Sequence, residues 1–119
     1  MIKGIGIDII EKRRFESNIS DSDFIGQFIG PNELNEEISN PKNVEFIATR
    51  FSIKEAVMKA LGSGLNQGYY WHDIEITNNG KVHLKGYFKN LADKMLVKHI
   101  HSSCSISKNY IVVLVILEG

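Results

Sequence analysis

Two short segments of the chain combine residue types that could hold a cation and a phosphate. The first is Gly4-Ile5-Gly6-Ile7-Asp8, in which glycines and a carboxylate alternate with isoleucines. In an extended strand the glycines and Asp8 share one face. Next to the Asp8 carboxylate this face has no side chains, so another group could approach the backbone closely and Asp8 could hold a cation. Equally, the glycines could admit a crossing helix while Asp8 caps the next turn, and short glycine motifs alone favour that simpler interpretation.

The second segment is residues 50–64, RFSIKEAVMKALGSG. On a helix, Ala48, Ser52, Glu55 and Lys59 share one face, because they recur at spacings of four, three and four. A surface Glu–Lys pair is the ordinary explanation of such spacing. Here, however, the face ends in Gly-Ser-Gly, whose free amides suit a phosphate. Since the C-terminus of a helix repels anions, a phosphate there would need Lys59 or a metal ion.

Taken together, the two segments predict a metal site. Mg²⁺ usually takes one or two protein carboxylates and completes its octahedron with water and phosphate oxygens. Asp8 on a strand and Glu55 on a helix packed across it would supply that pair. Lys59 would add a point charge to the same phosphates.

The elements that must position these residues follow from periodicity and turn signals. A helix over residues 44–61 buries Ile47, Phe51, Met58 and Leu61, and Gly62 ends it. Before this helix we expect a strand over 2–10, short helices over 13–18, over 20–28 with a Ser20-Asp21-Ser22 cap, and from Pro31, and a loop over 39–43. After it we expect two strands, over 71–77 and 81–86, joined by the turn Asn78-Asn79-Gly80. The chain then continues with a helix whose inward-facing residues are Phe88, Leu91, Met95, Ala92 and Leu96, and with strands over 101–107 and 110–117.

This order of elements predicts an α+β fold, with an antiparallel sheet packed on one long helix and shorter helices. The last strand, YIVVLVIL, is apolar enough to be covered on both faces or to lie in a subunit interface. We expect residues 1–119 to form a single domain.

Composition narrows the class of protein. Lys plus Arg and Asp plus Glu are each 14, so the net charge is zero, which argues against nucleic acid as a partner. The single cysteine, Cys104, allows no internal disulfide and is consistent with a reducing compartment. The apolar N-terminal stretch contains Asp8 and is too short for a secretory or membrane segment. We therefore expect a cytoplasmic protein that does not bind membranes.

The two segments resemble the signature motifs of the holo-[acyl-carrier-protein] synthases, the small class of 4′-phosphopantetheinyl transferases. The first family motif is roughly G-hydrophobic-G-x-D-hydrophobic-x-E, and the second roughly F-[AS]-x-K-E-A-x-x-K-A-x-G-x-G. The residues that match are Gly4, Gly6, Asp8 and Glu11 in the first motif and Phe51, Ser52, Lys54, Glu55, Ala56, Lys59, Ala60, Gly62 and Gly64 in the second. The second motif is long and specific, and the resemblance covers essentially the whole chain.

The resemblance implies an activity and a set of site residues. It implies that Asp8 and Glu55 hold Mg²⁺, or Mn²⁺ in its place, on the pyrophosphate of coenzyme A. Glu55, directly or through water, and Lys59 would help deprotonate a serine of apo acyl carrier protein, which then attacks the β-phosphate. The residues implied to contact coenzyme A are Arg50, Lys59, Gly62, Ser63, Gly64, His101 and Ser103. A homotrimer with active sites at the subunit interfaces is also implied, and Arg13 and Arg14 are the candidates for docking the acidic carrier protein.

The resemblance weakens near the C-terminus. The family commonly has H-x-S-[IV]-[ST]-H-[ST]-x-x-Y, and an ungapped alignment on Tyr110 keeps His101 and Ser103. Ile106 replaces the second histidine. This change affects the nucleotide end of the site and leaves the carboxylate pair intact.

Other chemistries are less well supported by the residues. His99 and His101 would share a strand face near Cys104, but no second pair with zinc-ligand spacing accompanies them. A nucleophilic Cys104 would need a matched base, and none can be placed. Two other functions stay open: a trimeric coenzyme A- or nucleotide-binding module that has lost catalysis, and another Mg²⁺-dependent enzyme such as a hydrolase of coenzyme A.

Overall fold

The computed structural model describes residues 1–17, 22–33, 44–62 and 71–119. Along the chain its elements are β1 (Ile2–Glu11), α1 (Lys12–Glu16), α2 (Ser22–Phe28), the 3₁₀ turn η1 (Pro31–Glu33), α4 (Val44–Ala60), the 3₁₀ turn η3 (Trp71–Asp73), β2 (Ile74–Ile76), β3 (Val82–Leu84), α5 (Gly86–Lys94), β4 (His99–Ile106) and β5 (Tyr110–Glu118). The predicted α+β class is confirmed. The expected loop over 39–43, the cap residues Ser20 and Asp21, and Ser63 and Gly64 lie outside the described residues.

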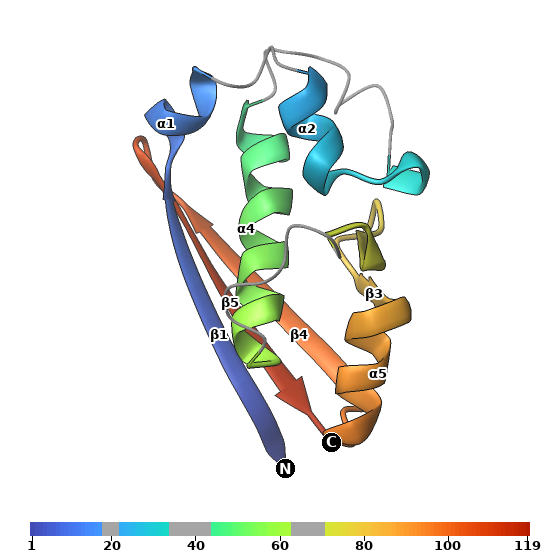
Figure 1. The fold of residues 1–119 in the computed structure, drawn as a ribbon. Helices are drawn as coiled ribbons and strands as arrows, with labels where there is room; N and C mark the ends of the chain where they lie inside the picture. Colours follow the sequence, from blue (N-terminus) through green and yellow to red (C-terminus); the bar gives the residue numbers. More distant parts are fainter. Residues whose placement is uncertain (18–21, 34–43, 63–70) are drawn as a thin grey trace.

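The main sheet is antiparallel and has the strand order β1-β5-β4, so the last strand of the chain is its central one. The register places Asp8 opposite Val113 and Ile7 opposite Leu114. The hairpin β2-β3 forms a separate two-stranded sheet. Helix α4 runs across one face of the main sheet, with α2, the hairpin and α5 on its other side, and the chain ends lie beside each other at the end of β1 away from α1 (Figure 1).

Strand β5 shows why one face of the sheet is covered. Its alternate residues Ile111, Val113, Val115 and Leu117 are fully buried under α4. The opposite face of the sheet is apolar but open: on β1, the side chains at positions 5, 7 and 9, all isoleucine, are 58–64% exposed. A single copy of this chain therefore covers the apolar strand on one side only.

The glycines of β1 set how closely α4 approaches the sheet. A β-carbon at Gly4 would overlap the carbonyl oxygen of Ala60, and one at Gly6 would overlap that of Ala56. The glycines do admit a crossing helix, as the simpler interpretation of the sequence had it. Asp8, however, does not cap the next helix, because α1 has Glu11 at its N-cap position.

Aromatic side chains join the short elements to α4. Phe51 contacts Phe15 of α1 and Phe28 of α2 edge to face, with ring centroids 5.1 Å apart in each pair. It also stacks on Trp71 of η3 at 5.1 Å and an interplanar angle of 23°. These contacts fix α1 and η3 against the middle of the long helix.

A buried ion pair ties α4 to the rest of this layer. Lys54 Nζ lies 2.6 Å from Glu33 Oε1, and the two side chains are 0% and 1% exposed. Lys54 also donates to the Phe28 carbonyl, while the Glu33 carboxylate accepts from the Gly30 and Ile76 amides. Burial lowers the pKa of Lys54, and the Glu33 carboxylate opposes that shift.

Two local predictions were wrong, for identifiable reasons. Residues 71–73 form a 3₁₀ turn instead of strand, because Trp71 stacks on Phe51 and His72 bonds the Gly26 carbonyl at 2.7 Å. The first expected strand is therefore reduced to Ile74–Ile76, and the second is Val82–Leu84 because α5 begins at Gly86. Leu96, expected to face inward, follows the end of α5 and is 67% exposed. No helix among the described residues is long and apolar enough to cross a membrane.

Candidate active site

The carboxylates of Asp8 and Glu55 meet where β1 passes under α4. Asp8 lies on the helix-facing side of its strand, on the same face as Gly4 and Gly6. Glu55 immediately precedes Ala56, whose carbonyl oxygen occupies the place that a β-carbon on Gly6 would need. The close approach that the glycines permit thus brings together two acidic groups 47 positions apart in the sequence.

Asp8 is held by two side chains from α4. Ser52 Oγ donates to Asp8 Oδ2 at 2.7 Å, and Lys59 Nζ lies 3.0 Å from Asp8 Oδ1. Lys59 also donates to the Ile7 carbonyl at 3.1 Å. The helical face predicted from the sequence therefore faces Asp8, with a buried serine in its middle and a half-exposed lysine at its end.

Glu55 is in the more strained electrostatic position of the two carboxylates. Burial raises its pKa, the Asp8 carboxylate raises it further, and Lys59 partly opposes both. A glutamate in this position readily accepts a proton, because protonation relieves both the desolvation and the repulsion from Asp8. Perturbed carboxyl groups of this kind in a cleft are typical of catalytic acids and bases.

A pocket of about 410 Å³ opens beside this pair. Its lining residues are Asp8, Ile9, Ile10, Glu11, Arg14, Phe15, Phe24, Phe51 and Glu55. One side is acidic and the other is aromatic. Arg14, predicted from the resemblance to dock a partner, lines this same pocket, whereas Arg13 is exposed on α1 and lines none of the pockets described here.

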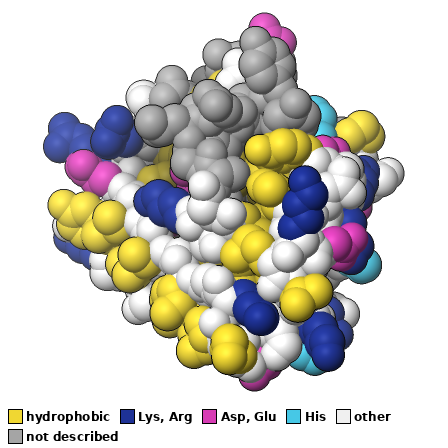
Figure 2. All heavy atoms as spheres, turned by 60° about the horizontal axis from the view of Figure 1, so that its bottom comes forward, with side chains coloured by type: hydrophobic (Ala, Val, Ile, Leu, Met, Phe, Trp, Pro, Cys, Tyr) yellow, Lys and Arg dark blue, Asp and Glu magenta, His cyan; other side chains and the backbone are white. Residues whose placement is uncertain are grey.

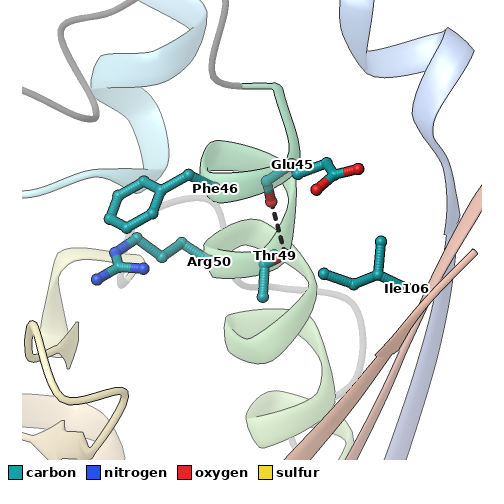
Figure 3. A pocket seen from close by; sticks show the side chains of 5 residues that line it. All are labelled: Glu45, Phe46, Thr49, Arg50 and Ile106. Carbon is teal, nitrogen blue, oxygen red and sulfur yellow. Dashed lines mark hydrogen bonds between the residues drawn. The ribbon is translucent and has the colours of Figure 1, made fainter.

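A second pocket, of about 300 Å³, lies beside the first turns of α4 (Figure 3). Arg50 and Ile106 line it, together with Glu45, Phe46 and Thr49. The Arg50 guanidinium lies 3.8 Å from the centre of the Phe46 ring, and its Nη2 donates to the Thr77 carbonyl at 3.3 Å. Arg50, implied to contact coenzyme A, and Ile106, which replaces the family's second histidine, thus line one pocket, and neither carboxylate of the pair lines it.

The remaining sequence candidates have separate locations. His101 and Ser103 pair with Ile116 and Leu114 in the register and lie on the sheet face opposite α4. There His101 Nε2 lies 3.0 Å from Glu118 Oε1. Gly62 has a φ of +73° just beyond α4, in keeping with the predicted helix end. Within one chain, therefore, His101 and Ser103 do not reach Asp8 and Glu55.

The donor set at the carboxylate pair suits a hard divalent cation. In the described parts of the chain, no three His, Cys, Asp or Glu side chains gather as an all-protein metal cage. Two carboxylates with open pocket beside them match the few protein ligands that Mg²⁺ takes when water and phosphate fill its other positions. Asp8 and Glu55 are the residues that would hold it.

The alternative chemistries find little support in the geometry. His99 and His101 have ring centroids 6.2 Å apart, and His101 is engaged with Glu118. Desolvation raises the pKa of the Cys104 thiol, so little of the nucleophilic thiolate is present at neutral pH.

Sequence reasoning missed two roles in the long helix. Ser52 was placed on the correct face, but its hydrogen bond to Asp8 was not foreseen; the signal was its spacing of seven from Lys59. Lys54 was counted only as part of a motif, yet it is the buried partner of Glu33. Its position beside Phe51 and Ile53 on a largely apolar helix was the available signal.

The fold and the site together define a class of enzyme. A carboxylate pair and a lysine beside a pocket are suited to transfer of a phosphate-containing group with a divalent cation. A sequence model of the 4′-phosphopantetheinyl transferase superfamily matches residues 4–115. The chain belongs to this superfamily, and the family resemblance is confirmed.

Individual relatives agree. The chain is 41% identical to a holo-[acyl-carrier-protein] synthase of Oceanobacillus iheyensis, over 99% of this chain and 98% of that one. The structure of a holo-[acyl-carrier-protein] synthase from Neisseria meningitidis matches with a TM-score of 0.81 and 27% identity, covering both chains completely. A Bacillus anthracis holo-(acyl-carrier-protein) synthase in complex with CoA (3′,5′-ADP) matches with a TM-score of 0.73 and 35% identity, covering 98% of this chain and 96% of that one.

Proposed function

We propose that this chain is a holo-[acyl-carrier-protein] synthase, which transfers 4′-phosphopantetheine from coenzyme A to a serine of apo acyl carrier protein and releases adenosine 3′,5′-bisphosphate. The observation that carries the proposal is the pair of carboxylates, Asp8 and Glu55, that lines one pocket, with Lys59 bonded to Asp8. Relatives that share the fold and carry this enzyme name support the choice of reaction.

Each residue of the site has a defined task in this reaction. Asp8 and Glu55 would hold Mg²⁺, which neutralises charge on the pyrophosphate of coenzyme A when bound. Ser52 keeps one Asp8 oxygen in place through its hydrogen bond. Lys59 is half-exposed and bound to Asp8 through its terminal group only. Its flexible stem would let it turn from Asp8 toward a phosphate oxygen.

Glu55 is the group best suited to accept the serine proton. It lines the pocket and can take the proton directly or through a water. The serine oxygen then bonds to the β-phosphorus, and the bond from that phosphorus to the bridging oxygen breaks. The electron pair leaves with adenosine 3′,5′-bisphosphate, while the proton stays on Glu55 or a water beside it.

Contacts to coenzyme A extend beyond the carboxylates. We assign its phosphates to Lys59 and to the segment Gly62-Ser63-Gly64 after α4. Arg50 would bind the nucleotide end, in the pocket where Ile106 supplies an apolar wall. His101 and Ser103, which lie on the far face of the sheet, would contribute from a neighbouring subunit.

A homotrimer is part of the proposal. The uncovered face of the main sheet, with its exposed isoleucines, is the surface that subunits would bury. Arg13 and Arg14 on α1 would then face the acidic carrier protein at the mouth of the pocket. We expect such an enzyme to work in the cytoplasm, where carrier protein and coenzyme A are both present.

The proposal is tested by intact-protein mass spectrometry of apo acyl carrier protein after incubation with this chain, coenzyme A and Mg²⁺. The expected result is a gain of one phosphopantetheine arm on the carrier serine, which EDTA abolishes. Asp8→Ala and Glu55→Ala should abolish it as well. Binding of coenzyme A without transfer would point to a module that has lost catalysis, and release of product without carrier protein would point to a hydrolase.

A further inference from the structure

The turn that ends α5 places a leucine where glycine is usual. Leu96 has a φ of +60°, and it is the only residue other than glycine with positive φ in the described part of the chain. Its amide donates to the Asp93 carbonyl at 3.0 Å, and the Val97 amide donates to the Ala92 carbonyl at 3.0 Å. These two bonds are those of a Schellman motif, whose left-handed position suits glycine because a β-carbon is strained there.

Leu96 also projects from the surface, with 67% of its area exposed. An exposed leucine by itself has little meaning, because every protein surface contains some. Here the exposed side chain also adopts a conformation that a leucine resists. Glycine at this position would avoid both the strain of the positive φ and the exposure of an apolar side chain, so it would favour folding stability. A leucine in this conformation therefore invites a functional explanation.

The surroundings of Leu96 are basic. Lys94 and Lys98 flank it in the sequence, and both are exposed. Gly119 packs between the Leu96 carbonyl and the Lys3 side chain, which brings β1 to the same end of the molecule. Ile2, 57% exposed, adds a second apolar side chain there. Figure 2, which turns this end toward the viewer, shows hydrophobic side chains interspersed with lysines and arginines.

The nearby carboxylates are already engaged. Asp93 accepts from Lys89 at 2.7 Å, one turn back on α5. Glu118 lies 3.0 Å from His101 on the outer face of the sheet. Neither of these two carboxylates pairs with Lys94 or Lys98, so both lysines can interact with a negative surface outside the molecule.

We propose that this end of the molecule, the Leu96 tip (Ile2, Lys3, Lys94, Leu96 and Lys98), makes shallow contact with an anionic lipid surface. An apolar side chain can enter the boundary between head groups and acyl chains without a complementary pocket. Lysines beside it keep their ammonium groups at the level of the lipid phosphates.

A protein partner fits this tip less well. A specific protein–protein interface usually buries about 1,200–2,000 Å² in total, whereas the apolar part of the tip is a few projecting side chains. A lipid surface needs no matching shape. If the chain forms the proposed trimer, cyclic symmetry would also place three tips on one side of the assembly, and their joint contact would strengthen a weak interaction.

Co-sedimentation with vesicles tests the proposal. The protein should bind vesicles that contain phosphatidylglycerol and release them at about 0.5 M salt, while phosphatidylcholine vesicles bind much less. Leu96→Gly should weaken binding roughly ten-fold. Neutralising Lys94 and Lys98 with glutamine should weaken it about five-fold for each lysine.

The variants separate lipid contact from misfolding. Leu96→Gly relieves the strained conformation, so its Tm should equal or exceed that of the unchanged protein. Lys81→Gln, in the turn between β2 and β3, removes one exposed lysine elsewhere and should leave binding unaltered. Equal binding by Leu96→Gly and the unchanged protein, or equal binding to both kinds of vesicle, would overturn the proposal, as would binding only to acidic proteins. Transferase activity on soluble carrier protein should be the same in all variants.

Discussion

Helix α4 carries two lysine–carboxylate pairs whose lysines are five residues apart. Lys54 pairs with Glu33 at 2.6 Å, and both side chains are almost completely buried. Lys59 pairs with Asp8 at 3.0 Å, but its side chain is 50% exposed and that of Asp8 is 13% exposed. The residue types are the same, so the difference between the pairs lies in their surroundings.

The buried pair has a complete set of partners. Lys54 donates to Glu33, to the Phe28 carbonyl and, at 3.4 Å, to the Trp71 carbonyl. With these groups satisfied, it has no capacity left for a ligand. A buried pair of this kind adds little net stability by itself, but loss of either partner leaves an uncompensated charge.

The exposed pair keeps room to change partners. Asp8 faces a pocket, and Lys59 reaches it from a helix end with solvent on the other side. Exposed pairs are weak, usually worth about 0–1 kcal/mol, so a phosphate or a cation can displace one at little expense. Burial therefore decides which lysine of this helix stabilises the fold and which is available to bind a ligand.

The largest effect should come from Lys54→Met. It leaves the Glu33 carboxylate buried without its cation, so the free energy of unfolding should fall by about 3–5 kcal/mol in urea denaturation. The matched change at the exposed pair, Lys59→Met, should cost less than about 1 kcal/mol. Similar losses from both variants would contradict the distinction between the pairs.

Glu55→Gln should lower activity without lowering stability. It keeps the shape of the side chain but removes the charge, so kcat/KM for transfer to carrier protein should drop by about 10²–10³. Urea denaturation should show no loss of stability, because the removed charge is partly desolvated and repelled by Asp8. A variant with near-normal activity would show that the carboxylate pair is not the metal site.

The main elements of the fold could be predicted from local signals. The Asn78-Asn79-Gly80 turn, the positive φ of Gly62 and the alternation along β5 each follow from residue type and spacing. Local signals do not show which residues distant in the sequence contact each other. Trp71 adopts a 3₁₀ turn because of a ring that is distant in the sequence, and Leu96 points outward through a turn that its residue type does not favour.

The carboxylate pair could likewise be named from the sequence, because its two motifs are dense in chemical side chains. The burial of Lys54 was signalled only by its apolar helix neighbours Phe51 and Ile53, whereas a lysine beside a glutamate usually indicates a solvated helix face. The sequence could not show that Arg14 lines the pocket of Asp8, or that Arg50 and Ile106 line a different one. Those relations depend on how the elements pack.

Gly6→Ala tests whether the exposed pair depends on the spacing of helix and strand. The new methyl group would overlap the Ala56 carbonyl, so α4 must move away from β1. We expect a loss of about 1–3 kcal/mol in unfolding free energy. Transfer activity should fall further than stability accounts for, because the shift separates Glu55 and Ser52 from Asp8. Gly26→Ala, on a helix with no atom near the added carbon, is the control and should leave activity unchanged.

The smallest effect should appear in the pH dependence of the metal-free protein. The pKa of Glu55 is raised above 4.5, so between that pH and the raised value the folded chain binds more protons than the unfolded one. The contribution of Glu55 to stability is therefore fully present below the unfolded pKa and is lost as pH rises through the folded pKa. Glu55→Gln lacks this titration, so the stability of the unchanged protein relative to the variant should decline across that window and then level off.

Metal affinity should follow the reverse course, because a cation needs the ionised carboxylate. Isothermal titration calorimetry should show Mg²⁺ binding weakening as pH falls through the raised pKa of Glu55, at a higher pH than an ordinary glutamate would produce. Opposite pH trends in the two measurements would assign both effects to Glu55, whose ionised form is disfavoured by folding and favoured by Mg²⁺. Parallel trends, or an affinity that stays constant across the pH window in which Glu55 titrates in the metal-free protein, would mean that Glu55 does not bind the metal. The contrast with the buried pair would then rest on Asp8 and Lys59 alone.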